Sequence, residues 1–502
     1  MQECNSMEKE QSLVPVVGSK NGSQLIIPEE KSENERKSEE DEFNYDLEGE
    51  HSETYSSFSK KRKILIVFIV TIAGFLGPVS GNIYIPILPM LQEVFHVSET
   101  CINATVSVFM AVFALAPLIW APWADFGGRK ALYIESLFFF ILANILLASL
   151  PPNIGGLYFL RIVQAFGASS VVSVGAGVIV DIIEGENRGK AISYFMLGPQ
   201  LGPILGPILS SIASDGSWRW IFGFQAILGC FVYLMILFLL PETLRYLVGN
   251  GSYYKNRWIV MPKLRQKRIV QDKRFPKPPK PTLKNFYFML KYKPVLLCSI
   301  NSGLLFGAFY GMSVTFSRVL DELYHFSNIE KSISYICPGI SLISGSISGG
   351  RLSDSLRKRI LAQKKEYIPE NRFSIQLVGL LISIAGLLGY GWSIQKQTHV
   401  SVIFIFTFLG GFGVTWVFVT TTTYLAECTP SQTATNVAIG NFMRNIAAAI
   451  SSAIMARLIR IMGFGWCFTG LALTELLCVA ILIVLIIYGP KWRNEFKTSL
   501  RK

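Results

Sequence analysis

Two charged side chains stand deep inside long apolar segments of the chain. Arg444 and Glu475 lie some ten and eleven residues from where their segments begin, so they should reach similar depths in a membrane. A lone charge at the centre of a membrane-spanning helix costs about 2.5–3.5 kcal/mol. An ion pair between Arg444 and Glu475 would offset part of that cost, and Glu475 could then titrate with a proton cycle. A structural clasp without a transport role is the alternative.

A third charge, Arg161, stands near the outer part of another apolar run. The same insertion cost predicts that Arg161 faces the interior of a helix bundle. Snorkelling of its side chain to the outer headgroups is the alternative. Asp181 ends that run near the inner surface, where it could exchange protons with the cytosol, although surface solvation is favoured.

A motif of small, acidic and basic residues occurs twice. APWADFGGRK at 121–130 contains Asp125 and Arg129, and GRLSDSLRK at 350–358 contains Asp354 and Arg357. In both copies a small residue stands four positions before the Asp, and two bases follow it closely. Taken alone, these charges are topology determinants and helix-end caps. Their recurrence at matching places predicts an internal repeat, which is typical of secondary transporters.

Glycine and proline alternate in a regular way near residue 200. A four-residue step keeps side chains on one face of a helix, and glycine on that face lets another helix approach closely. Each proline costs about 3 kcal/mol in a water-exposed helix. The run therefore predicts a bent, protein-buried membrane helix that lines a cavity or acts mechanically, with a simple packing face as the alternative. The three pairs are Gly198-Pro199, Gly202-Pro203 and Gly206-Pro207.

Long apolar segments must position these residues. The 502-residue chain is 51% hydrophobic and 16% charged, which indicates a polytopic membrane protein rather than a soluble enzyme. A bilayer core needs about 20 apolar residues per helix. That rule predicts twelve spans: 64–86, 102–122, 131–150, 157–179, 192–212, 221–240, 294–316, 333–350, 373–394, 400–425, 434–456 and 464–488.

Lys and Arg concentrate in alternate connections, which places both termini in the cytosol. The basic loop could lie on anionic lipids of the inner leaflet or be a solvated tether. The predicted organisation is an acidic disordered tail at 1–59, a six-helix bundle at 60–240, a basic cytosolic loop at 241–293, a second six-helix bundle at 294–490 and a short basic tail at 491–502.

Several chemistries are disfavoured by the composition. The eight cysteines are scattered and the chain has only four histidines, so no disulfide framework or metal site is expected. No GxxxxGK[ST] loop is present, so neither ATP nor another cofactor is implied. The net charge of +13 lies between apolar segments, where membrane orientation explains it better than nucleic-acid binding does.

These motifs resemble those of the major facilitator superfamily. Within it the chain is similar to the fungal twelve-span drug:proton antiporters, most of all to the quinidine-resistance, dityrosine and amino-acid or weak-acid exporters of yeasts. The residues that carry the resemblance are Asp125, Gly128, Arg129 and Lys130 in the first loop, Arg161, Gln164 and Gly167 in span 4, Gly198, Gly202, Pro203 and Gly206 of the span-5 antiporter motif, and the stretches GPVSGNIYIP at 77–86 and WRWIF at 218–222.

The resemblance implies an all-α fold of twelve transmembrane helices in two pseudo-symmetric six-helix bundles. It implies that Asp125 with Arg129, and Asp354 with Arg357, are latches that hold the outward-open state. It also implies a role in proton coupling for Arg161. Spans 1, 4, 7 and 10 line the substrate cavity in this superfamily, and here they offer Asn82, Tyr84, Asn301, Tyr310, Trp416 and Phe418.

The function expected is that of a monomeric proton antiporter, not an enzyme. It would export small amphipathic organic compounds, such as drugs, organic or amino acids or dityrosine-like metabolites, across a fungal membrane. The plasma membrane is favoured over the vacuolar or another internal membrane. Span 1 has no acid, which favours neutral, zwitterionic or anionic substrates. A proton-coupled importer of a nutrient and a transporter-like nutrient-sensing receptor are the alternatives.

Overall fold

The computed structural model describes residues 55–149, 151–213, 217–254, 258–260, 267–269, 277–278, 280–282, 288–326, 330, 333–364, 367–429 and 432–501. Every regular element within these ranges is a helix. The predicted acidic tail lies outside them except for its last residues, and parts of the predicted basic loop at 241–293 also lie outside them.

The first half of the chain supplies six membrane-crossing units. Two of them, spans 2 and 4, consist of two helices that follow each other in line. The elements are α2 (Lys60–Asn82), η2 (Ile85–Ile87), α3 (Leu88–Phe95), α4 (Glu99–Leu115), α5 (Pro117–Gly127), α6 (Arg129–Ser149), α7 (Ile154–Ala168), α8 (Val171–Ile182), η3 (Gly185–Asn187), α9 (Arg188–Ala213) and α10 (Arg219–Leu239). Short elements α11 (Arg245–Val248) and η4 (Ser252–Tyr254) follow them.

The second half supplies six more crossings. Its last helix is 69 residues long, but Gly463 interrupts it with a φ of 76° and a ψ of 167°. Only glycine adopts that backbone readily, so this residue separates spans 11 and 12. The elements are α13 (Lys293–Glu322), α15 (Ile336–Ala362), η5 (Pro369–Asn371), α16 (Arg372–Gln395), α17 (Val400–Cys428) and α18 (Thr433–Arg501).

The predicted twelve spans are therefore confirmed. Nine described helical segments are long and apolar enough to cross a membrane, and the longest of these is the pair joined at Gly463. The remaining two crossings, α9 and α15, are rich in Gly, Pro and Ser, which lowers their hydropathy. With 26 and 27 residues, each is about 40 Å long, which exceeds the thickness of a bilayer core.

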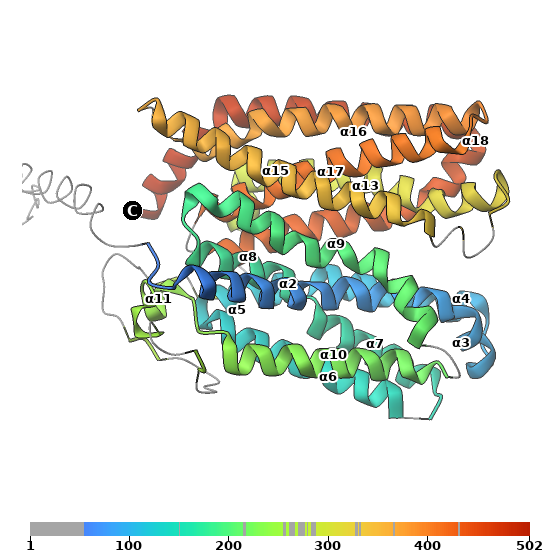
Figure 1. Cartoon of the computed structure of the whole chain (residues 1–502), viewed down its shortest axis with the longest axis horizontal. Helices are drawn as coiled ribbons and strands as arrows, with labels where there is room; N and C mark the ends of the chain where they lie inside the picture. The colour runs from blue at the N-terminus through green and yellow to red at the C-terminus, as the bar shows by residue number, and fades with distance from the viewer. Residues whose placement is uncertain are drawn as a thin grey trace, which may run out of the picture. The chain divides into compact units, whose positions relative to one another are not determined.

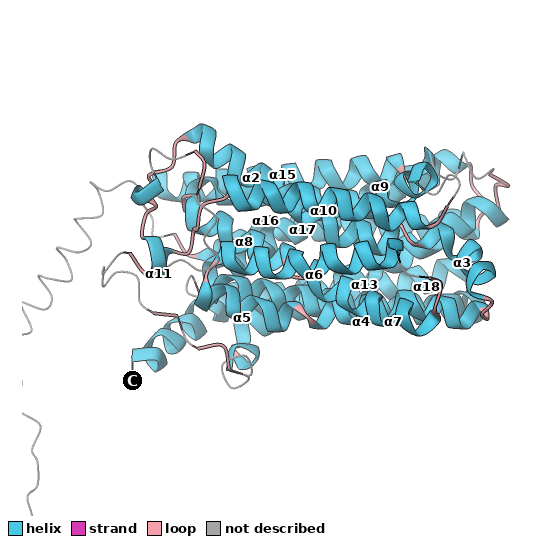
Figure 2. Ribbon diagram, turned by 90° about the horizontal axis from the view of Figure 1, so that it is seen from below, coloured by secondary structure: helices cyan, strands magenta, loops and turns pink. Residues whose placement is uncertain are grey.

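The helices run nearly parallel along the long axis (Figures 1 and 2). The C-terminus and α11 lie at one end, and α3 lies at the other (Figure 1). Because both predicted cytosolic features, the loop after span 6 and the C-terminal segment, share one end, we call it the cytosolic end.

The Gly-Pro run forms the contact between α2 and α9. Helix α9 continues through its prolines, and its glycines face α2. A Cβ on Gly202 would lie 2.5 Å from the Cβ of Pro78, and one on Gly206 would lie 2.8 Å from the Cβ of Asn82. A Cβ on Gly198 would collide with the backbone carbonyl of Thr71. The predicted close approach of two helices along this face is confirmed.

In the second half, the contact between spans 7 and 11 corresponds to the contact between spans 1 and 5. Here the row of glycines is on the first helix of the pair. Helix α13 presents Gly303, Gly307 and Gly311 to α18 at the same four-residue spacing. A Cβ on Gly303 would lie 3.0 Å from the carbonyl oxygen of Met443, and one on Gly307 would lie 3.2 Å from that of Ala447. The row of glycines at four-residue steps is thus on span 5 in the first half but on span 7 in the second.

Candidate functional site

The first Asp–Arg pair closes a tight turn at the cytosolic end. Asp125 lies in the last turn of α5 and Arg129 begins α6, and the Arg129 guanidinium donates to Asp125 at 2.5 Å. Its Nε donates to Asp181 at 3.1 Å, and all three side chains are buried. The expected solvation of Asp181 is wrong, because α8 ends against Arg129 rather than at the surface.

Glu242 completes this turn from the segment that follows α10. Its carboxylate accepts from the backbone N–H groups of Arg129 at 2.9 Å and Lys130 at 3.2 Å, and so caps α6. Gly128 has a φ of 119°, and a Cβ there would lie 2.6 Å from the Glu242 carboxylate. The conformation and the lack of space both require glycine at this position.

Asp125 also joins the two halves. It accepts from the backbone N–H groups of Ala434 at 3.1 Å and Thr435 at 2.9 Å, and from the Thr435 hydroxyl at 2.7 Å. These groups form the first turn of α18, where free N–H groups and the helix dipole favour a negative charge. A carboxylate of the first half therefore caps span 11 of the second half.

Asp354 makes the symmetric contact. It accepts from the backbone N–H groups of Gly189 at 2.9 Å and Lys190 at 2.7 Å, which begin α9. A carboxylate of the second half therefore caps span 5 of the first half. The cation that pairs with Asp354 is Arg372 of α16, at 3.2 Å.

The expected pair of Asp354 with Arg357 is wrong. Arg357 turns instead to Glu427, at 3.4 Å. Its guanidinium lies 4.3 Å from the ring centre of Tyr367, and partial burial raises the pKa of Tyr367 to about 12. Tyr367 is therefore neutral and contributes a ring face, not a charge. The Asp354 carboxylate is already occupied by the N–H groups that begin α9 and by Arg372, whereas Glu427 lies within reach of Arg357.

Glu427, at the end of α17, is the centre of a cluster that sequence reasoning missed. Two nitrogens of Arg372 donate to it at 3.0 Å each, Arg188 donates at 3.2 Å, and Arg357 donates at 3.4 Å. Arg188 begins α9 in the first half, so Glu427 links the halves beside the two caps. We call Glu427 with Arg188, Arg357 and Arg372 the Glu427 cluster. The available signal was an acid at the inner end of span 10.

The segment before α2 contacts the region around the Glu427 cluster through Tyr55. The Tyr55 hydroxyl donates to the carbonyl of Val180 at 2.8 Å and accepts from Arg188 at 3.0 Å. Arg245 donates to the Tyr55 carbonyl at 2.9 Å and lies 3.5 Å from the centre of its ring. This segment thus contacts an arginine of the Glu427 cluster.

Arg161 is enclosed within the first half, as predicted, and is fully buried. Its guanidinium lies 4.1 Å and 4.2 Å from the ring centres of Tyr84 and Phe109. One nitrogen donates to Gln164 at 2.7 Å and to the Ser80 carbonyl at 3.4 Å. Snorkelling to the outer headgroups is thus excluded.

The amide of Gln164 extends this contact into a buried polar chain. It donates to Asn144 at 2.7 Å and to Gln225 at 3.1 Å. The chain connects helices α7, α6 and α10 behind Arg161. None of the described carboxylates pairs with Arg161.

The predicted ion pair between Arg444 and Glu475 is wrong. Arg444 donates to Asn441 and, at 3.4 Å, to Ser302, whereas Glu475 accepts from Ser383 at 3.0 Å. The second Glu475 oxygen is buried and has no hydrogen-bond partner among the described residues. Equal depth did not bring the two charges together, because Arg444 faces α13 and α17 while Glu475 faces α16.

Four of the six predicted substrate residues come from α13 and α17, and three of these four are aromatic. Phe418 packs against Phe306 with ring centres 5.2 Å apart, and Phe306 packs against Tyr310 at 6.0 Å. Trp416 lies two residues from Phe418 and thus on another face of α17. It packs so closely on α16 that a Cβ on Gly379 would lie 2.8 Å from its ring. Trp416 and Phe418 therefore do not share one wall.

The remaining three predicted residues are Asn82, Tyr84 and Asn301, and they lie apart from these aromatic rings. Tyr84 is covered by Arg161, and its hydroxyl bonds Thr105 at 2.9 Å. Asn82 is half-buried and donates to the Pro78 carbonyl at 2.7 Å. Asn301 is fully buried, and neither polar atom of its amide has a hydrogen-bond partner among the described residues.

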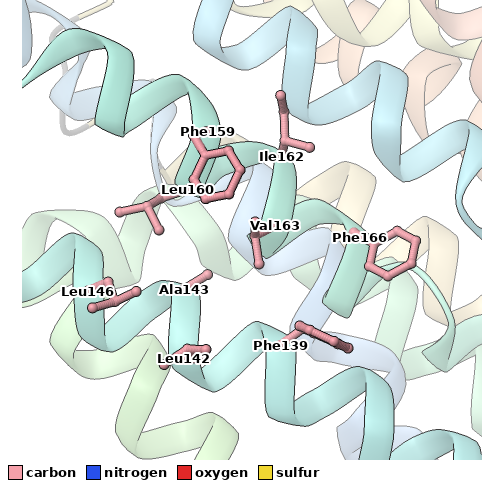
Figure 3. A pocket seen from close by; sticks show the side chains of 9 residues that line it. All are labelled: Phe139, Leu142, Ala143, Leu146, Phe159, Leu160, Ile162, Val163 and Phe166. Atoms are coloured by element: carbon pink, nitrogen blue, oxygen red, sulfur yellow. The ribbon is translucent and has the colours of Figure 1, made fainter.

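A cavity of about 430 Å³ lies between α6 and α7 (Figure 3). Its lining is entirely apolar, so it offers no group that could orient a polar substrate. The lining residues are Phe139, Leu142, Ala143, Leu146, Phe159, Leu160, Ile162, Val163 and Phe166.

Comparison with known proteins gives consistent matches. The profile of the Major Facilitator Superfamily matches residues 70–363. The Dityrosine transporter 1 of Saccharomyces cerevisiae is 44% identical over 87% of this chain and 82% of its own length. The Multidrug transporter DTR1 of Candida glabrata is 44% identical over 88% and 87%, respectively.

Among solved structures, the proton:xylose symporter XylE aligns with a TM-score of 0.63. The alignment covers 85% of this chain and 96% of the symporter at 15% sequence identity. At that identity the similarity shows the fold alone.

Proposed function

This chain belongs to the Major Facilitator Superfamily, and from that membership we propose that it is a proton-coupled antiporter that exports small organic compounds. It is a transporter, not an enzyme. The observation that carries the proposal is the 44% identity to a dityrosine transporter and to a multidrug transporter along most of the chain. The substrates we propose are amphipathic compounds of the dityrosine or drug type.

The mechanism we propose is alternating access, with rocking of the two halves around a central site. The caps made by Asp125 and Asp354, together with the Glu427 cluster, join the halves at the cytosolic end. These contacts have to break before the cytosolic side can open. Their role as latches is supported by their burial and by their symmetric placement.

For proton coupling we propose Arg161 with the chain of Gln164, Asn144 and Gln225. Glu475 is the proposed carrier of the proton, since it is a fully buried carboxyl that no cation neutralises among the described residues. The same proposal includes an antiporter role for the Gly198–Gly206 face and contact of the basic loop with anionic lipid. It also includes a plasma-membrane location and a monomeric state.

Purified protein in liposomes tests the direction of coupling. We expect vesicles with an acidic interior to accumulate dityrosine or a drug, because outward proton flow drives substrate inward through an antiporter. A protonophore should abolish the accumulation. Accumulation that requires an alkaline interior would identify a symporter. Accumulation that does not depend on the pH gradient would contradict proton coupling.

Arg161→Lys should lower gradient-driven accumulation about tenfold and Arg161→Ala should abolish it. Lysine keeps the charge but loses the planar contact with two rings, each worth roughly 0.5–2 kcal/mol. Exposed Arg460 on α18 supplies the control Arg460→Ala, which should transport as the wild type does. Equal loss of transport and of melting temperature in the Arg161 variants would instead indicate a structural role.

A further inference from the structure

Arg444 is a buried cation that the fold leaves without an anion. Its contacts are the Asn441 amide, the Ser302 hydroxyl and the ring of Phe418, whose centre is 5.2 Å from the guanidinium. None of the described carboxylates pairs with it. A buried guanidinium held only by neutral groups is poorly compensated, and an arriving carboxylate would supply the missing charge.

Arg444 also differs from Arg161 in its accessibility. Arg161 is 0% exposed and is closed between two rings, whereas Arg444 is 9% exposed. Helix α18 begins at Thr433, so Arg444 lies about 16 Å from its start, which is near the middle of the membrane. The partner of Arg444, Asn441, contacts Ser173 of the first half, so Arg444 lies beside the boundary between the halves, whereas Arg161 is enclosed within one half.

The surroundings of Arg444 suit an aromatic acid. Ser302, Phe306 and Tyr310 follow one another at four-residue steps and so form one row on α13. Phe418 of α17 packs on Phe306 beside this row. The row places a hydroxyl next to the guanidinium and half-buried ring faces one and two turns away. A molecule with a carboxylate and an aromatic ring one or two helical turns apart could contact the guanidinium and the ring faces at the same time.

Arg444 is further connected to the other half of the protein. The Asn441 oxygen accepts from Arg444, while the Asn441 nitrogen donates to Ser173 of α8 at 3.3 Å. A carboxylate that takes a hydrogen bond from Arg444 competes with the Asn441 oxygen. Occupancy of the site would therefore change a polar contact between the two halves.

We propose that Arg444 and Ser302 bind the carboxylate of an aromatic organic acid, with Phe306, Tyr310 and Phe418 holding its rings. This assignment rests on the proposed export function and names its substrate class. Arg444 is thus a substrate-binding residue, and binding of a substrate there would alter the contact of Asn441 with the first half.

The test compares dityrosine with its bis-methyl ester, which keeps the rings and the amines but lacks the carboxylates. In gradient-driven liposomes we expect the wild type to prefer the acid by about tenfold or more, because hydrogen bonds to a charged partner are the strong ones. Arg444→Gln should lose this preference while it still moves the ester. Arg444→Lys should keep part of it, and the exposed control Arg460→Gln should keep all of it.

The outcomes separate the two proposals. If the wild type moves neither compound, the proposed export of aromatic compounds fails, and the assignment of Arg444 fails with it. If the wild type moves both equally, or if Arg444→Gln retains the preference, only the assignment of Arg444 is overturned. Should neither Arg444 variant fold, the acid-to-ester ratio of the wild type decides alone.

Discussion

Gly198→Ala is expected to abolish transport and to lower the melting temperature of the protein. The added methyl group would collide with the backbone carbonyl of Thr71, which belongs to α2 and cannot swing aside as a side chain can. Overpacking of this kind costs about 1–3 kcal/mol, and more where backbone must move. Because α2 and α9 approach along this whole face, the shift would spread to both helices.

The matched control for this change is Gly470→Ala on α18. A Cβ at Gly470 would meet nothing within 4 Å, so the substitution should be harmless or slightly stabilising in a helix. Melting of the detergent-solubilised protein and gradient-driven accumulation are the two measurements. Wild-type behaviour of Gly198→Ala would show that α2 and α9 do not need their close approach.

Glu427→Gln is expected to open the cytosolic side. The glutamine would leave Arg188, Arg357 and Arg372 without their shared anion, and breaking such a buried charge cluster typically costs about 3–5 kcal/mol. Because Arg188 belongs to the first half, the substitution should destabilise the conformation in which the two halves meet at the cytosolic end. Transport should fall at least tenfold.

The opening can be followed by maleimide labelling of a Ser193→Cys probe. Ser193 is fully buried between α9 and α15, and Ser346 donates to its carbonyl at 3.1 Å. Glu427→Gln should increase the labelling rate of this cysteine, measured against the same background without it. The exposed pair of Arg318 with Glu322 provides the control Glu322→Gln, which should change stability by at most about 0.5 kcal/mol. An unchanged labelling rate in Glu427→Gln would show that the cluster does not hold the gate.

The two predictions depend on contacts that differ in how far apart the contacting residues are in the sequence. The Gly-Pro spacing already indicated a close helix contact, because periodicity along one helix is written in the sequence. It could not indicate that α2 was the partner, nor that α13 would carry the glycines in the second half. The Glu427 cluster joins residues up to 239 positions apart, and no local pattern connects them.

The sequence by itself determined the twelve spans and the turn at Asp125 and Arg129, because apolar length and short-range spacing are local properties. The tertiary structure decided which face of each helix meets which neighbour. It paired Asp354 with Arg372 instead of Arg357, and it separated Arg444 from Glu475 at equal depth. Depth is given by position along a helix, but a contact also requires the right rotation about the helix axis, and only the packing of the whole bundle sets that rotation.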